Sequence, residues 1–342
     1  MKRVGHLIEK IAALDNLYLA YAKACRGKRL KKEVMLFEAN FDQNIALLRE
    51  SILSGKVDVG NYYYFTIHDP KERVICAASF HERVLHHAIM NVCHPYFDRS
   101  LIDDTYATRI GKGVYAALHK AKNGISKEQW LCKLDVRKYF DSINHEVLKE
   151  MLKRKFKDAR LLQIFFSIID SYSHGEGKGL PIGNLTSQYF ANMYLSCFDH
   201  FAKEQLKVKM YVRYMDDILM AFDQKQTMKE IEHQLRHYAE SQLMLQLKPP
   251  VFVKGGTGCV FLGYRVRPHY ITLSGRSKRR FRSKYLKYKK MFETGIFSEK
   301  EYQAHLLPLF AFVRQAKSKC FRKNCLSISN YVRCTPIVGR TA

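Results

Sequence analysis

Two periodicities of hydrophobic and polar residues run through this chain, and together they predict an α+β fold. In the first sixty residues apolar side chains recur every three to four positions, as at Leu7, Ile11 and Leu14, which is typical of amphipathic helices. Helical patterns return in five later segments, residues 80–96, 145–171, 185–204, 227–243 and 275–290. We therefore expect helices to make up most of the structure.

Short apolar runs bounded by turn residues predict the strands. Residues 62–67 and 73–78 form one predicted hairpin around Pro70, and residues 130–136 form a separate apolar strand. A second strand pair is predicted to begin at residues 260–264. The strands therefore lie between helical segments along the chain.

The most informative pattern is KMYVRYMDDILMAF, residues 209–222. Two apolar runs flank Met215, Asp216 and Asp217, which predicts a β-hairpin with two carboxylates at its tip. Asn-Gly or Asp-Gly would stabilise such a turn better, because these residues accept a positive φ. Two adjacent acids between buried strands instead indicate a cationic ligand, and Mg²⁺ is usually held by one or two carboxylates plus substrate phosphates. Considered alone, an Asp-Asp pair is far more often a solvated acidic turn, so the remaining motifs decide.

A third acid lies in a similar setting. Asp135 stands near the end of the apolar strand WLCKLDV, residues 130–136. An ionised carboxylate in a buried strand is costly without a partner, and a metal ion would remove that cost. Asp141, Ser142 or Asn144 could cap the helix that follows, so we assign Asp141 a structural role.

The overall charge points to a polyanionic partner. Lysine and arginine number 58 against 32 acids, a net charge of +26, and nucleic acid is the expected partner. An anionic membrane surface is the competing interpretation, but no run approaches the roughly 18 consecutive apolar residues of a membrane span. Glu9, Lys10 and Asp15 also interrupt the place where a signal peptide needs an apolar core. We expect a cytoplasmic protein whose nine cysteines are reduced.

Basic residues gather in two segments. Arg109 and Lys112 belong to a glycine-punctuated loop that would allow the backbone close to a ligand. Residues 275–290 contain nine cations and no acid, with aromatic residues at helical spacing, so one side of this helix would pack while the other offers cations to a nucleic-acid backbone. The residues predicted to contact nucleic acid are Arg109, Lys112, Arg276, Lys278, Arg279, Arg280, Arg282 and Lys284.

In their order and spacing these motifs resemble a reverse transcriptase over roughly residues 60–290. The motifs are the strand closing on Asp135, the glycine turn LPIGNLTSQ at 180–188, YMDD at 214–217 and FLGY at 261–264. YMDD alone would be a weak signal, whereas the combination is specific. The resemblance implies a right-hand polymerase, with an N-terminal helical extension at 1–60, fingers at 61–128, a palm of antiparallel sheet and helices at 129–272 with a fingers-like insertion near 145–180, and a basic helical thumb and tail at 273–342.

The resemblance also implies roles for individual residues. Two Mg²⁺ ions about 4 Å apart, or Mn²⁺ in their place, would activate the primer 3′-hydroxyl and neutralise the pyrophosphate. Asp135, Asp216 and Asp217 would be catalytic and would form the metal site together with Val136. The dNTP would be bound by Lys71, Arg73, Phe140, Ile182, Gly183 and Gln188. The primer would be gripped by Phe261, Leu262, Gly263 and Tyr264.

Two of these assignments carry further detail. The aromatic ring of Phe140 stands where this superfamily excludes a 2′-hydroxyl, which is consistent with selecting deoxynucleotides. Lys248 lies near the place where relatives have a lysine that acts on pyrophosphate, although the two prolines after it leave the alignment open.

Within that superfamily, which includes group II intron and retron enzymes, the resemblance is closest to reverse transcriptases of diversity-generating retroelements. Ile182-Gly183 and Ser187-Gln188 stand where most relatives have Gln-Gly and Ser-Pro. The resemblance implies copying of a template-repeat RNA with frequent errors at adenines, with Ile182 and Gln188 as candidates for loosened base selection. It further implies a bacterial or phage origin and a small basic accessory protein as partner, which can be oligomeric.

Three alternatives stay open at this point. A group II intron or retron-like enzyme without mutagenic function would share the same motifs, although the retron Val-Thr-Gly signature is missing and the region after the thumb is short for an intron enzyme. A non-catalytic RNA-binding cofactor would have no need of all three acids. An RNA-templated RNA polymerase is disfavoured by Phe140.

Overall fold

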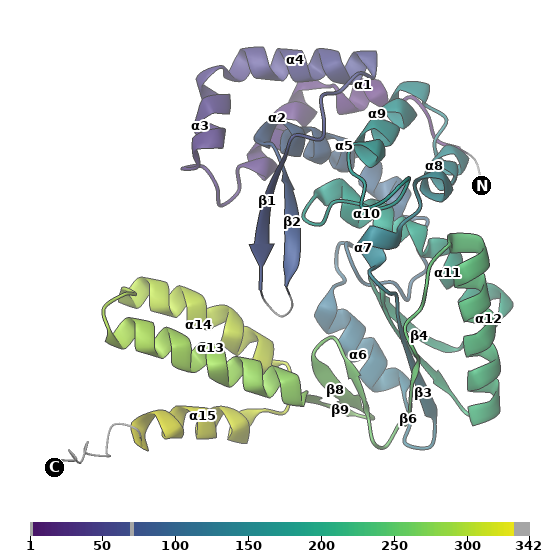
Figure 1. Cartoon of the computed structure of the whole chain (residues 1–342), viewed down its shortest axis with the longest axis vertical. Coiled ribbons are helices and arrows are strands. Elements are labelled where there is room, and N and C mark those ends of the chain that lie inside the picture. The colour runs from purple at the N-terminus through teal and green to yellow at the C-terminus, as the bar shows by residue number, and fades with distance from the viewer. Residues whose placement is uncertain (1–2, 69–71, 332–342) are drawn as a thin grey trace.

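Four antiparallel strands form the sheet around which the chain is built (Figure 1). The computed structural model describes residues 3–68 and 72–331. The strands follow the order β4-β5-β3-β6 and are β3 (Trp130–Asp135), β4 (Met210–Tyr214), β5 (Asp217–Phe222) and β6 (Val251–Lys254). The predicted hairpin at 209–222 is confirmed as β4 and β5.

Different helices cover the two faces of this sheet. Because neighbouring residues of a strand point to opposite faces, Cys132 and Leu134 enter one core and Leu131 enters another. The first core is shared with α10 (Leu185–Tyr194), α11 (Ser196–His200) and α12 (Lys225–Leu243), and the second with α6 (Val114–Gly124). Burial on both faces explains why residues 218–222 are uniformly apolar.

The N-terminal helices extend the first core. These are α1 (Ile8–Ile11), α2 (Leu14–Ala24), α3 (Lys32–Ala39) and α4 (Phe41–Ser54), which pack around α5 (Phe80–Asp98) as the predicted helical pattern requires. The same core includes α7 (Tyr139–Ser142), α8 (His145–Lys155) and α9 (Ala159–Asp170). Of the three predicted capping residues, Asn144 caps α8 by accepting a hydrogen bond from the Val147 amide at 3.0 Å.

A two-stranded ribbon projects from this helical part in Figure 1. It consists of β1 (Tyr62–Ile67) and β2 (Arg73–Ala78), the predicted hairpin, with the pair Ile67 and Arg73 nearest its turn. The side chains of Tyr63, Tyr64 and Phe65 are exposed, because only the base of the ribbon packs on the core.

The C-terminal part consists of a small sheet and three helices. Its strands are β7 (Cys259–Phe261), β8 (Tyr264–Arg267) and β9 (Tyr270–Leu273), so the predicted strand pair is in fact three-stranded. The helices are α13 (Gly275–Glu293), α14 (Glu299–Arg314) and α15 (Lys319–Tyr331). Phe281 and Tyr285 of α13 are buried while most of its cations are exposed, as the aromatic spacing predicted.

The predicted helix at 185–204 is interrupted. It ends as α10 at Tyr194 and resumes as α11, which passes into a single π-helical turn, η1 (Phe201–Gln205). None of the helices that the structure describes combines the length and hydrophobicity that a bilayer span requires.

Candidate active site

Strand register brings the three predicted acids to one edge of the central sheet. Asp135 is the last residue of β3 and lies directly opposite Asp217, the first residue of β5, in their antiparallel pairing. Asp216 precedes it in the turn from β4. By strand alternation, Asp135 and Asp217 also share a face with Lys133, since Lys133 lies two residues before Asp135. Strand pairing thus assembles the site from residues that lie far apart in the sequence.

The YMDD turn has a strained backbone conformation, and a buried ion pair stabilises it. Met215 adopts φ 53°, a left-handed conformation that costs a non-glycine residue about 1 kcal/mol or more. Arg213, which is 0% exposed, donates a hydrogen bond to the Met215 carbonyl at 3.0 Å. Asp199 of α11 pairs with Arg213 through both carboxylate oxygens, at 2.7 and 2.6 Å, and also accepts a hydrogen bond from the Tyr211 hydroxyl. The buried ion pair therefore fixes the turn that carries Asp216.

The carboxylates of the turn lie in an environment that disfavours their charge. Burial raises the pKa of Asp216, and the negative charge of Asp135 raises it further, against smaller opposite effects of Lys248 and Arg73. Burial also raises the pKa of Asp217 to about 6, although the ammonium of Lys133 lies 3.0 Å away and lowers it. Both carboxylates are thus costly to ionise where they lie, and a bound cation would reduce that cost.

Lys248 reaches the same edge from the segment after α12. Its ammonium forms an ion pair with Asp135, and its backbone amide donates to the Asp135 carbonyl at 2.9 Å. The preceding residue, Leu247, forms a bridge with Val136, which is buried. The backbone of this segment therefore continues the sheet and places a lysine beside the first acid.

The residues at this edge fit a hard divalent cation. In the arrangement of side chains seen here, no three His, Cys, Asp or Glu side chains among the described residues converge on one point. Mg²⁺, however, usually takes only one or two protein carboxylates together with substrate phosphates and water. Asp135 and Asp216 supply that number, and the pKa of Asp216 is raised by burial first and by the charge of Asp135 second.

The predicted nucleotide-binding residues approach the acids from two directions. Arg73 is exposed at the first position of β2, and its charge acts on Asp216. Lys71 lies outside the described residues. Phe140, in α7, is half-buried, and its carbonyl accepts a hydrogen bond from the Leu180 amide at 2.8 Å. Phe140 is thereby tied to the start of the glycine turn.

The glycine turn is fastened to the ribbon. The Cys76 amide donates to the Ile182 carbonyl at 2.8 Å, and the Ala78 amide donates to the Asn184 side chain at 3.1 Å. Gly183 has φ +121°, and a Cβ there would come within 2.9 Å of Ile75. Gln188, also in the predicted set, is exposed on α10. The segment of Ile182 and Gly183 is therefore attached to β2.

The predicted primer grip forms the turn between β7 and β8 and is bound to the C-terminal helices. Leu262 and Gly263 have positive φ, and Phe261 and Tyr264 are buried on either side. The Ser277 hydroxyl of α13 donates to the Gly263 carbonyl at 2.5 Å. The Tyr264 hydroxyl donates to the Phe312 carbonyl of α14 at 2.8 Å. The turn is thus the joint between the small sheet and α13 and α14.

Two of the predicted nucleic-acid-binding residues also pair within the fold. The guanidinium of Arg109 donates to both oxygens of Asp98, at 2.6 and 3.2 Å, and to the carbonyls of Ile102 and Thr105. Lys112 pairs with Asp103 at 2.7 Å. Both residues therefore have structural partners, and their contact with nucleic acid stays a prediction. The α13 cations fit their prediction better, since Arg276, Lys278, Arg279, Arg280 and Arg282 are exposed and Lys284 is half-buried.

Sequence reasoning missed two features of the site. Arg213 was visible as a lone charge inside the apolar run MYVRY, which signals a buried ion pair, but its partner Asp199 could not be found without the fold. Lys133 was visible two residues before Asp135, on the same face of a predicted strand.

The sequence model of the reverse transcriptase (RNA-dependent DNA polymerase) family matches residues 68–266. This chain belongs to the reverse transcriptase family. The matched range contains Asp135, Asp216 and Asp217. The chain is accordingly a nucleotidyltransferase of the RNA-directed DNA polymerase class, and its antiparallel sheets and helices are consistent with a polymerase fold.

Comparison with curated proteins gives homology to group II intron-encoded proteins. The chain is 23% identical over 207 residues to the group II intron-encoded protein LtrA of Lactococcus lactis, covering 57% of this chain and 34% of LtrA. It is 21% identical over 282 residues to protein YkfC of Escherichia coli strain K12, covering 68% of this chain and 73% of YkfC. The chain thus spans about a third of the length of LtrA.

Solved structures similar to this reverse transcriptase include telomerase from Candida albicans in complex with a TWJ fragment of telomeric RNA. That similarity has a TM-score of 0.46 at 11% identity and covers 81% of this chain and 66% of the other.

Proposed function

We propose that this protein synthesises cDNA from dNTPs on an RNA template by two-metal nucleotidyl transfer. The observation that carries the proposal is the pairing of Asp135 opposite Asp217, with Asp216 beside them in a strained turn. The pKa values of Asp216 and Asp217 are raised, so keeping these carboxylates ionised side by side destabilises the metal-free protein. Such perturbed groups are typical of functional sites.

Asp135 and Asp216 would hold the metal ions, with Asp217 and Val136 beside them. Bound Mg²⁺, or Mn²⁺, activates a primer hydroxyl and neutralises the leaving pyrophosphate in enzymes of this kind. Arg73 binds the triphosphate from the ribbon, and Lys248 provides a further cation next to Asp135. Lys71 belongs to the same proposed set.

The remaining residues orient the nucleotide and the duplex. Ile182, Gly183 and Gln188 line the nascent base pair, and Phe140 excludes a 2′-hydroxyl. Phe261, Leu262, Gly263 and Tyr264 hold the primer, and the exposed cations of α13 contact its backbone. In this scheme residues 61–128 are fingers, 129–272 palm and 273–342 thumb and tail, after an N-terminal extension at 1–60.

We further propose that the enzyme serves a diversity-generating retroelement in a bacterial or phage system. Support comes from Ile182-Gly183 and Ser187-Gln188, the residue variants that resemble that group. The template would then be a template-repeat RNA copied with errors at adenines, and a small basic accessory protein would assist.

A faithful intron-type enzyme is the second candidate function. The similarity to the group II intron-encoded protein LtrA favours it. Its RNA would be an intron, and no excess of errors at adenine would be expected.

Sequencing of cDNA made on a defined RNA template separates these two functions. The reaction contains primer, dNTPs and Mg²⁺, and Ile182→Gln is the matched variant. Errors concentrated opposite adenine in the wild type and reduced in Ile182→Gln support the diversity-generating role. Equal fidelity at all four template bases would leave the intron-type function. A Phe140→Ala enzyme tested with ribonucleotides checks sugar selection, because loss of the ring should allow their incorporation.

A further inference from the structure

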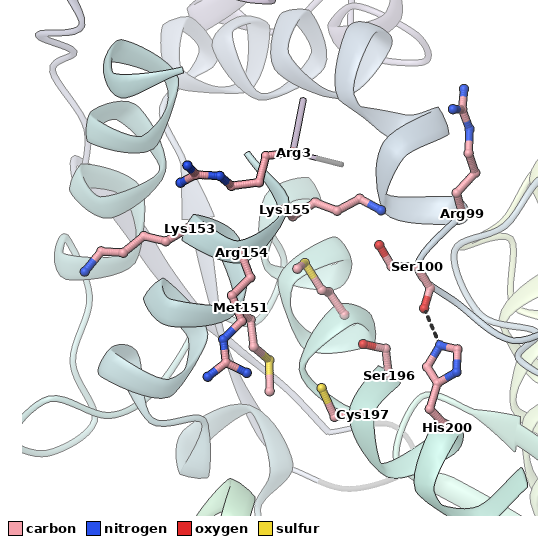
Figure 2. A pocket seen from close by; sticks show the side chains of 11 residues that line it. Arg3, Arg99, Ser100, Met151, Lys153, Arg154, Lys155, Ser196, Cys197 and His200 are labelled. Atoms are coloured by element: carbon pink, nitrogen blue, oxygen red, sulfur yellow. Dashed lines mark hydrogen bonds between the residues drawn. The ribbon is translucent and has the colours of Figure 1, made fainter. Parts of the chain in front are cut away.

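A basic hollow lies on the far side of α11 from the YMDD turn. It has a volume of about 710 Å³, and Figure 2 shows its lining side chains. They come from the N-terminal segment, the end of α5, α8 and the α10 to α11 region: Arg3, Arg99, Ser100, Met151, Lys153, Arg154, Lys155, Met193, Ser196, Cys197 and His200. Asp199 of α11 turns instead to Arg213 under the sheet, so the helix separates the hollow from the catalytic acids.

Folding gathers cations here from segments far apart in sequence. A parallel bridge joins Val4 to Phe156, with the Val4 amide donating to the Lys155 carbonyl at 2.9 Å. This bridge places Arg3 beside Lys155. On the other side, His200 is hydrogen-bonded to the Ser100 carbonyl at 3.1 Å, which fixes α11 against the end of α5. The hollow is therefore formed by the fold and does not come from one basic segment of the sequence.

The charge in the hollow is of one sign. None of its lining residues is acidic. Arg3, Arg99 and Arg154 are exposed, whereas Lys155 is only 6% exposed. Burial lowers the pKa of Lys155, and the charge of Arg99 lowers it further. Lys153 pairs with Glu150 at 2.6 Å, so we do not count it among the binding cations.

The rest of the lining is apolar or hydroxylic. Met151, Met193 and Cys197 provide soft apolar surface, and Ser100 and Ser196 provide hydroxyl groups. A bare anion would use only the cations. A nucleotide would use both parts, because its phosphate binds arginine and lysine while its base and sugar pack on methionine.

We propose that this hollow is a second nucleotide-binding site, which takes a phosphate-bearing nucleotide unit of a folded RNA. Its phosphate and those of neighbouring nucleotides lie against Arg3, Arg99 and Arg154, whose guanidinium groups reach different sides of the hollow (Figure 2), and the base packs on Met151 and Met193. The site is distinct from the dNTP site and needs no metal. A free nucleotide presents the same chemistry, and the experiment distinguishes the two sources.

The test measures binding of a fluorescein-labelled RNA hairpin with a single-stranded overhang, by anisotropy at several salt concentrations. It uses the full chain carrying Asp216→Asn and no dNTP, so the readout does not depend on polymerisation. The test variant is Arg99→Gln/Arg154→Gln. The control is Lys153→Gln/Arg160→Gln, which removes the same charge nearby but outside the binding cations, since Arg160 pairs with Glu9 at 2.6 Å.

We expect the test variant to bind the hairpin about tenfold more weakly than the control. The slope of log affinity against log salt should fall by about 1.5, because each lost phosphate contact contributes roughly 0.7 to 0.9. Direct titration with adenosine monophosphate identifies the source. Nucleotide binding lost in the test variant, with hairpin binding unchanged, would assign the site to a free nucleotide.

Test and control variants that bind both probes equally would overturn the proposal. Primer extension on a preannealed duplex, measured with Asp216 restored, should be the same in both variants. A failure of polymerisation in the wild type would concern the catalytic proposal only, since the binding readout is independent of it.

Discussion

Lys248 and Asp135 are joined twice, by an ion pair between their side chains and by a hydrogen bond from the Lys248 amide to the Asp135 carbonyl at 2.9 Å. The backbone bond fixes where the lysine lies, and the side-chain pair compensates part of the negative charge at the sheet edge. The ammonium therefore competes with any cation that Asp135 binds.

Replacing Lys248 by Met should lower the Mg²⁺ concentration for half-maximal polymerisation. The side chains are 40% and 34% exposed, so the pair contributes at most about 1 kcal/mol, which corresponds to a shift of up to about fivefold. The maximal rate should fall, because a cation next to the pyrophosphate is lost. Mg²⁺ titration of primer extension measures both. Lys254→Met is the control, since that lysine lies at the other end of the sheet, and a raised Mg²⁺ requirement in Lys248→Met would contradict this account.

Arg213→Met should destabilise the protein strongly. The substitution leaves Asp199 as a buried, uncompensated charge and removes the donor to the Met215 carbonyl. The free energy of unfolding should fall by about 3–5 kcal/mol. Arg160→Met, at an exposed ion pair, should change it by less than about 1 kcal/mol. Urea denaturation measures the free energy of unfolding of both variants. A similar decrease in the two would show that the buried pair with Asp199 does not stabilise the turn more than an exposed ion pair would.

Gly183→Ala should weaken dNTP binding as well as stability. Alanine would be strained at φ +121° and its Cβ would press on Ile75 of β2, 2.9 Å away. The ribbon that carries Arg73 would have to shift. Gly111→Ala is a control with positive φ (+74°) and nothing within 4 Å of the added Cβ, so it measures backbone strain alone, about 1 kcal/mol. We expect the KM for dNTP to rise in Gly183→Ala but not in Gly111→Ala. Equal KM values would show that the glycine turn does not affect nucleotide binding.

The pH dependence of stability should reflect Asp217. Its pKa is raised from 3.8 to about 6, so between these values the folded protein holds a proton that the unfolded chain has released. The resulting stabilisation is complete below pH 3.8 and is lost as the pH rises to about 6. Asp217→Asn should therefore be more stable than the wild type near neutral pH without metal, by up to about 3 kcal/mol. Thermal unfolding of both proteins from about pH 4 to about pH 7 checks the sign, and a less stable variant at neutral pH would contradict it.

The sequence predicted those parts of the structure that local pattern controls. The two apolar runs in residues 209–222 and the strand ending at Asp135 were sufficient to predict the hairpin and the strand-end acid. The aromatic spacing in residues 275–290 predicted the buried side of α13.

Contacts between residues far apart in the sequence could not be predicted from local pattern. Charge and glycine content indicated a ligand at Arg109, but nothing local indicates that Asp98, eleven residues earlier, uses that guanidinium. The third strand of the small sheet was missed because β9 has only four residues. Similarly, the attachment of Ile182 to Cys76 depends on two segments a hundred residues apart.

The most direct test of the central claim is primer extension on an RNA template with dNTPs and Mg²⁺, comparing the wild type with Asp216→Asn. Asp141→Asn is the matched control, because Asp141 lies in the neighbouring α7 and only approaches His174, at 3.9 Å. We predict metal-dependent cDNA synthesis that falls by at least about a hundredfold in Asp216→Asn, a loss of ~3 kcal/mol in transition-state stabilisation, and that persists in Asp141→Asn. Extension by Asp216→Asn at the wild-type rate would contradict the assignment of this sheet edge as the catalytic centre.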